Sequence, residues 1–304
     1  MNIGILIFSK PKQALEQALP GTAALVRAGK QHGHVIHLFY EPLLTIRPGN
    51  NSKGIEVLYE NKPFPVCDAV IPRPNFLEEP SLHITTIEAL THIGVPLLNG
   101  KEGFLPSKNK LAQKLTFTKA GIPVPPWSIV RAPECAADAA TVLGFPLILK
   151  VPFGRGGKGV FYVENQETLL PLIDYLNIRD RNPVIMETFI KEAGRSDRRA
   201  FVIGGRIIAA MERTAKSWDI RANIHSGGSA QPIILSPEEE TLAIRAAAAF
   251  DLEIAGVDLI PSKHGSLVLE VNPHPGFETL SEVTGIDVAD AIIKYVEQRF
   301  IHVS

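Results

Sequence analysis

Two carboxylates and a carboxamide mark residues 255–272 as a segment whose side chains could do chemistry. The segment reads AGVDLIPSKHGSLVLEVN, in which two apolar runs flank a short polar turn, a pattern typical of a β-hairpin. If the hairpin is centred near His264, Asp258 lies directly opposite Glu270, and Asn272 shares their face because side chains alternate along a strand. Facing carboxylates repel each other unless a cation lies between them. Oxygen ligands without sulfur or imidazole suit magnesium or manganese, so the segment predicts a metal site at these three residues.

The hairpin pattern has a second interpretation, since alternating acids also occur on the solvated face of an antiparallel sheet. The following residues, NPHPGF, favour a functional role, because two prolines and a glycine give a rigid, exposed loop suited to shaping a substrate pocket. In the expected register Val268 shares the carboxylate face, whereas Leu267 and Leu269 lie on the core face.

A glycine-rich segment, PLILKVPFGRGGKGV at residues 146–160, has the composition of a phosphate-binding element. Its backbone N–H groups could lie against phosphates, with Lys150, Arg155 and Lys158 adding positive charge. It lacks the GxxxxGK[ST] order of a P-loop, and a hairpin turn with solubilising charges stays an alternative. Lys150 is more informative, because a lysine in an apolar strand needs a partner, and an anionic phosphate would be one.

The segment DIRANIHSGG gathers four polar side chains at alternating positions: Asp219, Arg221, Asn223 and His225. On a strand they would all point to one side, towards a single ligand. Arg221 offers a forked guanidinium for phosphate or carboxylate, whereas a lone histidine is more often structural. The charges of FIKEAGRSDRR, at 189–199, are those of a solvated face.

The first hundred residues alternate strand and helix patterns, which predicts a parallel sheet with right-handed crossovers. No GxGxxG follows the first strand, so a dinucleotide site is not expected. The expected strands are 2–8, 34–40, 67–73 and 95–99, the expected helices are 21–33 and 81–94, and GIEVLYE and KPF form a short hairpin.

A helix is expected over 107–120, with Ser107 as its N-cap and Gly121 at its end, before a proline-rich lobe boundary. Beyond it the signals are mixed, and from about residue 183 they are mainly those of strands and hairpins. The further expected strands are 127–130, one that ends at Lys150, and 159–163, and the further helices are 133–143, 166–176, 237–249 and 286–299.

Composition bounds the function. The chain has 304 residues, enough for two or three lobes, and a net charge of −1, so no basic field invites nucleic acid. Its two cysteines, Cys67 and Cys135, are far apart and form no metal-binding motif, which favours a reducing compartment. No apolar run reaches the length of a membrane span. We therefore expect a cytoplasmic protein without nucleic-acid or membrane partners, and a homo-oligomer stays open.

Together, these segments resemble the RimK-like branch of the ATP-grasp superfamily, amino-acid ligases that include ribosomal-protein glutamate ligase. The resemblance is densest in IKEAGRSDRR, DIRANIHSGG, AGVDLI and EVNPHPGFE, and SKNKLAQKLTFTKAGIPVPP matches the start of the central region. It implies the α/β and α+β ATP-grasp fold. A Rossmann-like lobe would occupy residues 1–100, a central lobe with the glycine loop 101–187, and a C-terminal lobe with the metal site 188–304, with ATP between the last two.

The resemblance also implies roles for particular residues. ATP phosphates would be contacted by Lys110 and Lys150, and the adenine hinge would be formed by Glu187, Thr188 and Phe189. Asp197 would lie near the ribose. Arg221 and Asn223 would act as catalytic residues at the γ-phosphate and acyl phosphate, and magnesium would be held by Asp258, Glu270 and Asn272. Three positions depart from the family pattern: Thr188 replaces a glutamate, Ser226 an arginine, and His274 the serine of an SPG loop. Ser226, His274 and Gly276 would form a substrate loop.

The expected reaction is an ATP-dependent carboxylate–amine ligation through an acyl phosphate, with ATP and Mg²⁺ or Mn²⁺ as cofactors. It would add an amino acid, glutamate-like, to a peptide, a protein tail or a small molecule. Two alternatives stay open. One is a small-molecule ligase of the lysine-biosynthesis or glutathione type, and the other is an ATP-binding regulatory protein that has lost catalysis.

Overall fold

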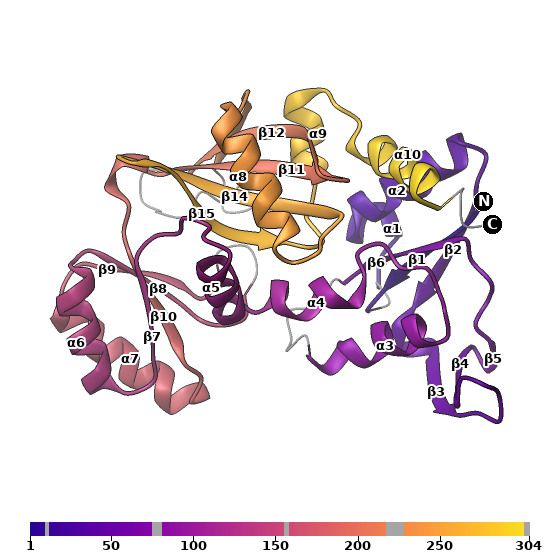
Figure 1. Ribbon diagram of the computed structural model, residues 1–304, viewed down its shortest axis with the longest axis horizontal. Helices are drawn as coiled ribbons and strands as arrows, with labels where there is room; N and C mark the ends of the chain where they lie inside the picture. The colour runs from indigo at the N-terminus through magenta and orange to yellow at the C-terminus, as the bar shows by residue number, and fades with distance from the viewer. Residues whose placement is uncertain (10–11, 75–80, 155–157, 217–227, 301–304) are drawn as a thin grey trace.

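The computed structural model describes residues 1–9, 12–74, 81–154, 158–216 and 228–300. Its strands form separate sheets that lie side by side along the long axis of the molecule (Figure 1). No helix among these residues is both long enough and apolar enough to cross a membrane.

The N-terminal sheet is parallel, in the order β2-β1-β6, as the alternating pattern predicts. The side chains of β1 are almost all buried, because helices cover both faces of the sheet: Ile3 and Ile5 belong to one core cluster and Leu6 to another. Residues 95–99 do not form the expected strand; Leu97 makes only an isolated bridge to Val70. The elements are β1 (Asn2–Ile7), α1 (Leu15–Ala18), α2 (Pro20–Gln31), β2 (Val35–Tyr40), β6 (Ala69–Arg73) and α3 (Ser81–His92).

A small antiparallel sheet, in the order β3-β4-β5, extends from this lobe. The expected hairpin is present as β4 paired with β5, and an unpredicted strand, β3, adds to it. The elements are η1 (Glu41–Leu43), β3 (Leu44–Pro48), β4 (Ile55–Tyr59) and β5 (Lys62–Pro63).

The helix expected over 107–120 is in fact two helices, α4 (Lys101–Lys108) and α5 (Lys110–Lys119). Ser107 is not the N-cap: it lies inside α4, where its hydroxyl donates to a carbonyl one turn earlier. The cap is Asn109, whose Oδ1 accepts from the backbone N–H groups of Leu111 and Ala112 at 2.9 and 3.4 Å. An asparagine that satisfies free N–H groups starts a new helix here, and α5 therefore begins at Lys110.

The central lobe has an antiparallel sheet in the order β7-β10-β8-β9, with α6 and α7 on one face (Figure 1). In β8 the side chains alternate, so that Leu147 and Leu149 enter the lobe's core and Lys150 points to the opposite face. The elements are β7 (Trp127–Val130), α6 (Pro133–Leu143), β8 (Leu147–Lys150), β9 (Val160–Val163), α7 (Gln166–Asp180) and β10 (Val184–Thr188).

The C-terminal sheet is antiparallel, in the order β13-β12-β11-β14-β15, with α8 packed on one face (Figure 1). The sequence interpretation missed α9. The elements are η2 (Lys191–Ala193), β11 (Ser196–Ile203), β12 (Arg206–Thr214), β13 (Ser229–Pro232), α8 (Pro237–Ala248), β14 (Ile254–Ser262), β15 (Gly265–Asn272), α9 (Glu278–Thr284) and α10 (Val288–Phe300).

The carboxylate hairpin, β14 and β15, pairs Asp258 with Glu270 as predicted. The position of the turn and the regularity of the strands differ from the prediction. The turn closes between Ser262 and Gly265, half a residue away from the expected centre. A β-bulge next to Asp258 inserts one extra residue in β15 and restores the pairing.

The bulge also overturns the expected faces of β15. Val268 is fully buried in the core beneath α8 instead of sharing the carboxylate face. Leu269, expected in that core, is the extra residue at the bulge and lies outside the cluster of buried residues. One inserted residue reverses the side on which the preceding side chains lie.

Two buried amide side chains, Asn99 and Gln113, form hydrogen bonds between the lobes. The Gln113 amide pairs with both backbone groups of Val271, at 2.9 Å each, so α5 lies against the edge of β15. The Asn99 amide donates to the carbonyls of Ile254 and Pro273 at 2.7 and 2.6 Å. Phe117 of α5 belongs to the core under α8. We still propose the three lobes, with α5 as the element that joins the central and C-terminal ones.

Candidate active site

A buried carboxylate between two lysines forms the first part of the site. Glu187 of β10 is held by Lys114 Nζ and Lys150 Nζ, each at 2.7 Å from one of its oxygens. The Glu187 and Lys114 side chains are each only 2% exposed, and that of Lys150 is 12% exposed. We call these three residues the lysine cluster. The partner of the strand lysine is therefore a carboxylate, which leaves the cluster with two ammonium groups against one negative charge.

The surplus charge affects how these groups titrate. Burial alone would raise the pKa of Glu187, but the ammonium groups of Lys114 and Lys150 outweigh it and lower that pKa below its ordinary value. Glu187 is therefore ionised at neutral pH. Burial, aided by the repulsion of Lys150, lowers the pKa of Lys114. An additional anion beside this cluster would relieve that cost.

Lys110 connects the glycine-loop stem to the carboxylate hairpin. Its Nζ lies 3.6 Å from Glu270 Oε2 and donates to the Gly154 carbonyl at 3.2 Å. Its backbone N–H also donates to the Pro152 carbonyl at 3.1 Å. Because Lys114 lies one turn later on α5, both lysines project from the same side of the helix. The central lobe and the hairpin thus meet at a lysine-rich site.

The C-terminal sheet contributes a second charged group, the arginine–aspartate network. Arg199 donates from Nε and Nη2 to the two oxygens of Asp258, at 2.7 Å each. Arg213 donates in the same forked manner to Asp197, at 2.7 Å each, and its Nη2 also lies 2.9 Å from Asp258 Oδ2. Two guanidiniums and two carboxylates balance, so the network of Asp197, Arg199, Arg213 and Asp258 is neutral as a unit.

The two aspartates of the network are not equivalent. Burial would raise the pKa of Asp258, but Arg199 and Arg213 outweigh it and hold that pKa well below its usual range. Burial raises the pKa of Asp197 to about 6, although Arg213 opposes the shift. Asp258 is therefore the carboxylate that keeps its charge, and Asp197 takes up a proton first as the pH falls.

The predicted metal ligands supply oxygen donors of the kind that magnesium prefers. Glu270 is 33% exposed, and Lys110 is its cationic neighbour at 3.6 Å. Asn272 Oδ1 accepts the backbone N–H of His274 at 3.1 Å and keeps a second lone pair. Asp258 already binds arginines through both oxygens, so it could reach a cation only by sharing them. The donor set fits magnesium, with Glu270 as the least committed ligand.

His274, assigned to the substrate loop, adds no positive charge to the site. Both ring nitrogens are buried without a hydrogen-bond partner, and the ring meets Phe104 edge-on with centroids 5.6 Å apart. Burial, together with the nearby charges of Lys108 and Arg73, lowers the pKa of His274 well below its ordinary value. The imidazole is neutral at physiological pH. Gly276, also assigned to the substrate loop, is exposed.

The predicted adenine hinge uses its backbone within the central lobe. The N–H of Thr188 donates to the Pro126 carbonyl at 3.0 Å, and that of Phe189 donates to the Pro146 carbonyl at 3.1 Å. The Phe189 ring meets Tyr162 edge-on at a centroid distance of 5.1 Å. Contacts of this segment with adenine stay a prediction.

Several residues that the sequence analysis singled out lie outside the described residues: Arg155, Asp219, Arg221, Asn223, His225 and Ser226. Sequence reasoning missed Lys114 and the arginines of β11 and β12. The charges of residues 189–199 predict a solvated face, yet the Arg199 side chain is only 14% exposed. Two signals could have found these residues: the four-residue spacing of the lysines on one helix, and the alternation of Asp197 with Arg199.

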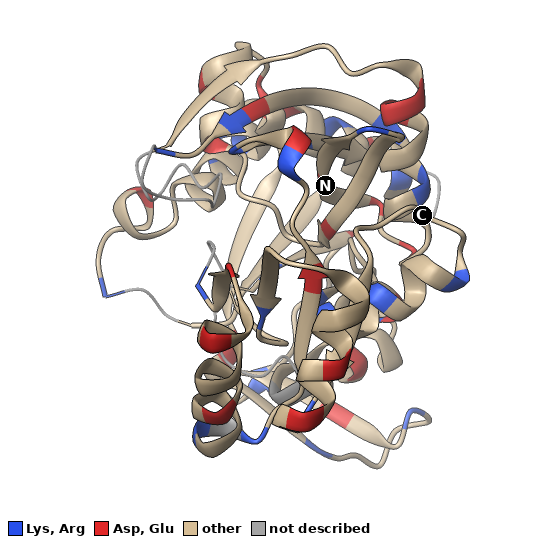
Figure 2. Cartoon of the chain, turned by 90° about the vertical axis from the view of Figure 1, so that its left-hand side faces the viewer, with Lys and Arg blue, Asp and Glu red and all other residues tan. Residues whose placement is uncertain are grey.

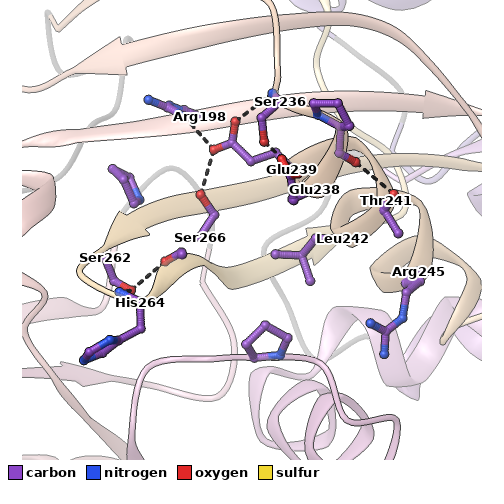
Figure 3. A pocket seen from close by; sticks show the side chains of 14 residues that line it. Arg198, Ser236, Glu238, Glu239, Thr241, Leu242, Arg245, Ser262, His264 and Ser266 are labelled. Atoms are coloured by element: carbon purple, nitrogen blue, oxygen red, sulfur yellow. Dashed lines mark hydrogen bonds and ion pairs between the residues drawn. The ribbon is translucent and has the colours of Figure 1, made fainter.

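The site does not coincide with the open hollow of about 780 Å³ between α8 and the turn of the β14–β15 hairpin. Figure 3 shows Glu239 at its rim, bound to Arg198 and to Ser266. Among the described residues, no predicted ATP or metal residue lines this hollow. In Figure 2 basic and acidic residues are interspersed over the face shown, in keeping with the net charge of −1.

Comparisons with known proteins identify the family. Residues 107–296 match the model of the RimK-like ATP-grasp domain. The chain is 36% identical over 285 residues to a protein of Stutzerimonas stutzeri named "Probable alpha-L-glutamate ligase", covering 92% of each. It is 35% identical over 301 residues to a protein of the same name from Alkalilimnicola ehrlichii, covering 98% of this chain and 96% of the relative.

The fold is similar to two solved structures. One is the ATP-grasp ligase PsnB complexed with a minimal precursor, Mg and ADP (TM-score 0.73, 18% identity, 98% of this chain and 97% of that one). The other is the RimK domain protein of Sphaerobacter thermophilus (TM-score 0.70, 20% identity, 96% and 99%). The expected ATP-grasp architecture is thus confirmed. The chain belongs to the RimK-like ATP-grasp family and is an ATP-dependent ligase that joins a carboxylate to an amine.

Proposed function

We propose that this ligase adds an amino acid of the glutamate type to a peptide, a protein tail or a small molecule, through an acyl phosphate. Support comes from relatives named as alpha-L-glutamate ligases and from one contact above all. That contact is Lys110 Nζ with Glu270 Oε2, 3.6 Å apart, where the phosphate-binding lobe meets the carboxylate hairpin.

The charges of the side chains suggest two roles, phosphate binding by the lysines and magnesium binding by the oxygen donors. Lys110, Lys114 and Lys150 offer three ammonium groups against the two carboxylates of Glu187 and Glu270, and the surplus positive charge suits them to the phosphates of ATP. Glu270 and Asn272, with Asp258 sharing its oxygens, would hold magnesium, which neutralises phosphate charge when bound. Arg221 and Asn223 are proposed at the γ-phosphate. Phosphoryl transfer needs alignment and charge neutralisation more than a covalent protein nucleophile.

The substrate loop is proposed to set a substrate ranking different from that of ribosomal glutamate ligases. A second substrate carboxylate needs a fixed cation or several N–H donors, because an unpaired buried carboxylate is costly. Ser226 carries no charge, and His274 is neutral in its buried position. A substrate carboxylate must therefore find another partner than these two side chains.

A screen tests the proposal. Amino acids, short peptides and small metabolites are offered in pairs with Mg–ATP, phosphate release is measured, and the products are identified by mass spectrometry. We expect one class of pair to give amide products, and the same pair to give none with Glu270→Ala. Tight ATP binding without turnover on any pair would instead point to a regulatory ATP-binding protein, and products from small metabolites alone would point to a small-molecule ligase.

The double variant Ser226→Arg, His274→Ser tests the substrate loop on the same panel. We expect glutamate to gain about tenfold in kcat/KM relative to neutral amino acids, because one charged contact is worth roughly that much. An unchanged ranking would show that these positions do not set specificity, while leaving the ligase assignment intact.

A further inference from the structure

Two histidines and a glutamate meet far from the active site, where the end of α2 and the start of β2 face α10. His32 Nδ1 lies 3.1 Å and His34 Nε2 lies 2.9 Å from Glu297 Oε1. Within the part of the chain that the structure describes, these form a group whose ligand atoms all lie within 4.8 Å of one another. None of the three belongs to the ATP, metal or substrate residues assigned above.

We propose that His32, His34 and Glu297 bind a divalent transition-metal ion of the zinc class. Zinc bonds to imidazole nitrogen and carboxylate oxygen are about 2.0–2.2 Å long, which puts neighbouring ligands of a tetrahedral ion roughly 3.3 Å apart. The two measured separations, 3.1 and 2.9 Å, need only a small expansion to reach that value. Imidazole ligands favour zinc, copper or nickel over the hard cations of the ATP site.

The surroundings of His32 strengthen the assignment. Its second nitrogen, Nε2, lies 2.7 Å from Asp290 Oδ1, and Lys294 Nζ holds the other oxygen of Asp290 at 2.8 Å. A carboxylate that accepts the outer N–H of a metal-bound histidine fixes its tautomer and its orientation. Asp290 therefore leaves Nδ1 of His32 as the free ligand atom, facing Glu297.

Cations lie at the edge of the cluster. His34 Nδ1 lies 3.5 Å from the N-terminal amino group, and Lys294 Nζ binds Asp290 Oδ2 at 2.8 Å. The other ring nitrogen of His34, Nε2, faces Glu297 Oε1, as Nδ1 of His32 does. The proposed ligand atoms of both histidines therefore point to the same carboxylate oxygen.

The ligands are accessible and come from distant parts of the chain. The side chains of His32, His34 and Glu297 are 22%, 9% and 25% exposed, so an ion can enter from solvent. α10 is the last described helix, and α2 and β2 belong to the N-terminal lobe (Figure 1). A metal here would tie the two ends of the fold together and stabilise it without touching the active site.

The test titrates Zn²⁺ into the metal-free full-length protein, without nucleotide and with excess Mg²⁺ to occupy the carboxylate hairpin. We expect one zinc per chain by calorimetry and a rise in Tm of about 2–5 °C. Co²⁺ should give the visible d–d absorption of a site with few ligands. Weak, non-stoichiometric binding to the wild type, or no rise in Tm, would overturn the proposal.

Variants separate this site from other zinc-binding groups. The double variant His32→Gln, His34→Gln should lose at least about 100-fold in zinc affinity, whereas His37→Gln, in β2 and outside the cluster, should bind as the wild type does. Asp290→Asn keeps every proposed ligand and should lose about 10- to 100-fold, which also serves if the double variant fails to fold. Undiminished zinc binding by Asp290→Asn, or by the folded double variant, would place the zinc elsewhere.

Discussion

The lysine cluster and the arginine–aspartate network look alike, because each holds a buried carboxylate between two cations, but their charge balance differs. Lys114 and Lys150 share the single carboxylate of Glu187, so one positive charge is left over. In the network Arg199 and Arg213 face two carboxylates, and no charge remains. A surplus of positive charge favours the binding of an anion, whereas in a balanced network the charged side chains bind and orient one another.

The difference separates a binding function from a positioning function within one site. The lysine cluster holds two ammonium groups against one carboxylate, and burial together with the repulsion of Lys150 lowers the pKa of Lys114. A phosphate beside the cluster would balance the surplus charge. The network orients Asp258 from both sides and fixes strands β11, β12 and β14 against one another. The two hairpin carboxylates then behave differently: Asp258 is committed to arginines, and Glu270 is available.

The largest expected effect comes from Glu270→Ala. Turnover at saturating magnesium should fall about 1000-fold or more, because a metal ligand supplies several kcal/mol of transition-state stabilisation. The protein should stay folded, since Glu270 is outside the buried network. Asp258→Asn should lose activity and also lower the free energy of unfolding, because the arginines lose their partner. Equal free energies of unfolding for the two variants would contradict the claim that Asp258, and not Glu270, stabilises the fold through the arginines.

Next comes the stability of the lysine cluster. Glu187→Gln leaves two buried ammonium groups unpaired and should lower the free energy of unfolding at pH 7 by about 3–5 kcal/mol. The pKa of Glu187 is lowered in the folded state, so its stabilisation is present above the ordinary value of 4.5 and is lost as the pH falls below it. Urea titrations from pH 7 to pH 2 should show a shallower acid loss in the variant. Parallel curves would contradict this.

A smaller effect distinguishes the strand lysine from the loop lysine. Lys150→Ala should weaken ATP turnover about 100-fold, because a preorganised charge at the phosphates is lost. Lys158→Ala should cost less than about tenfold, since Lys158 is exposed and a screened contact contributes less. The measurement is kcat/KM for ATP, with fold checked by circular dichroism. If both variants lose activity to the same extent, the surplus charge of the cluster has no special role.

Local sequence patterns predicted most of the elements but not the charge partners. Alternation and apolar runs identified the parallel sheet and the opposition of Asp258 to Glu270. They could not reveal that β11 brings Arg199 beside Asp258, because that pairing joins residues far apart in the sequence. The break at Asn109 and the bulge at Leu269 depend on a single cap and a single extra residue. A hydrophobic period is read over many residues, so it does not show a change that depends on one residue.

The central claim is that the protein activates a carboxylate with ATP as an acyl phosphate. The direct measurement uses the productive substrate pair with oxygen-18 in the carboxylate, analysing nucleotide and phosphate by mass spectrometry. We predict ADP as the nucleotide product and one labelled oxygen in the released phosphate, because the carboxylate attacks the γ-phosphate. Hydroxylamine should also divert the reaction to a hydroxamate. AMP and pyrophosphate as products, or phosphate without the label, would contradict the mechanism.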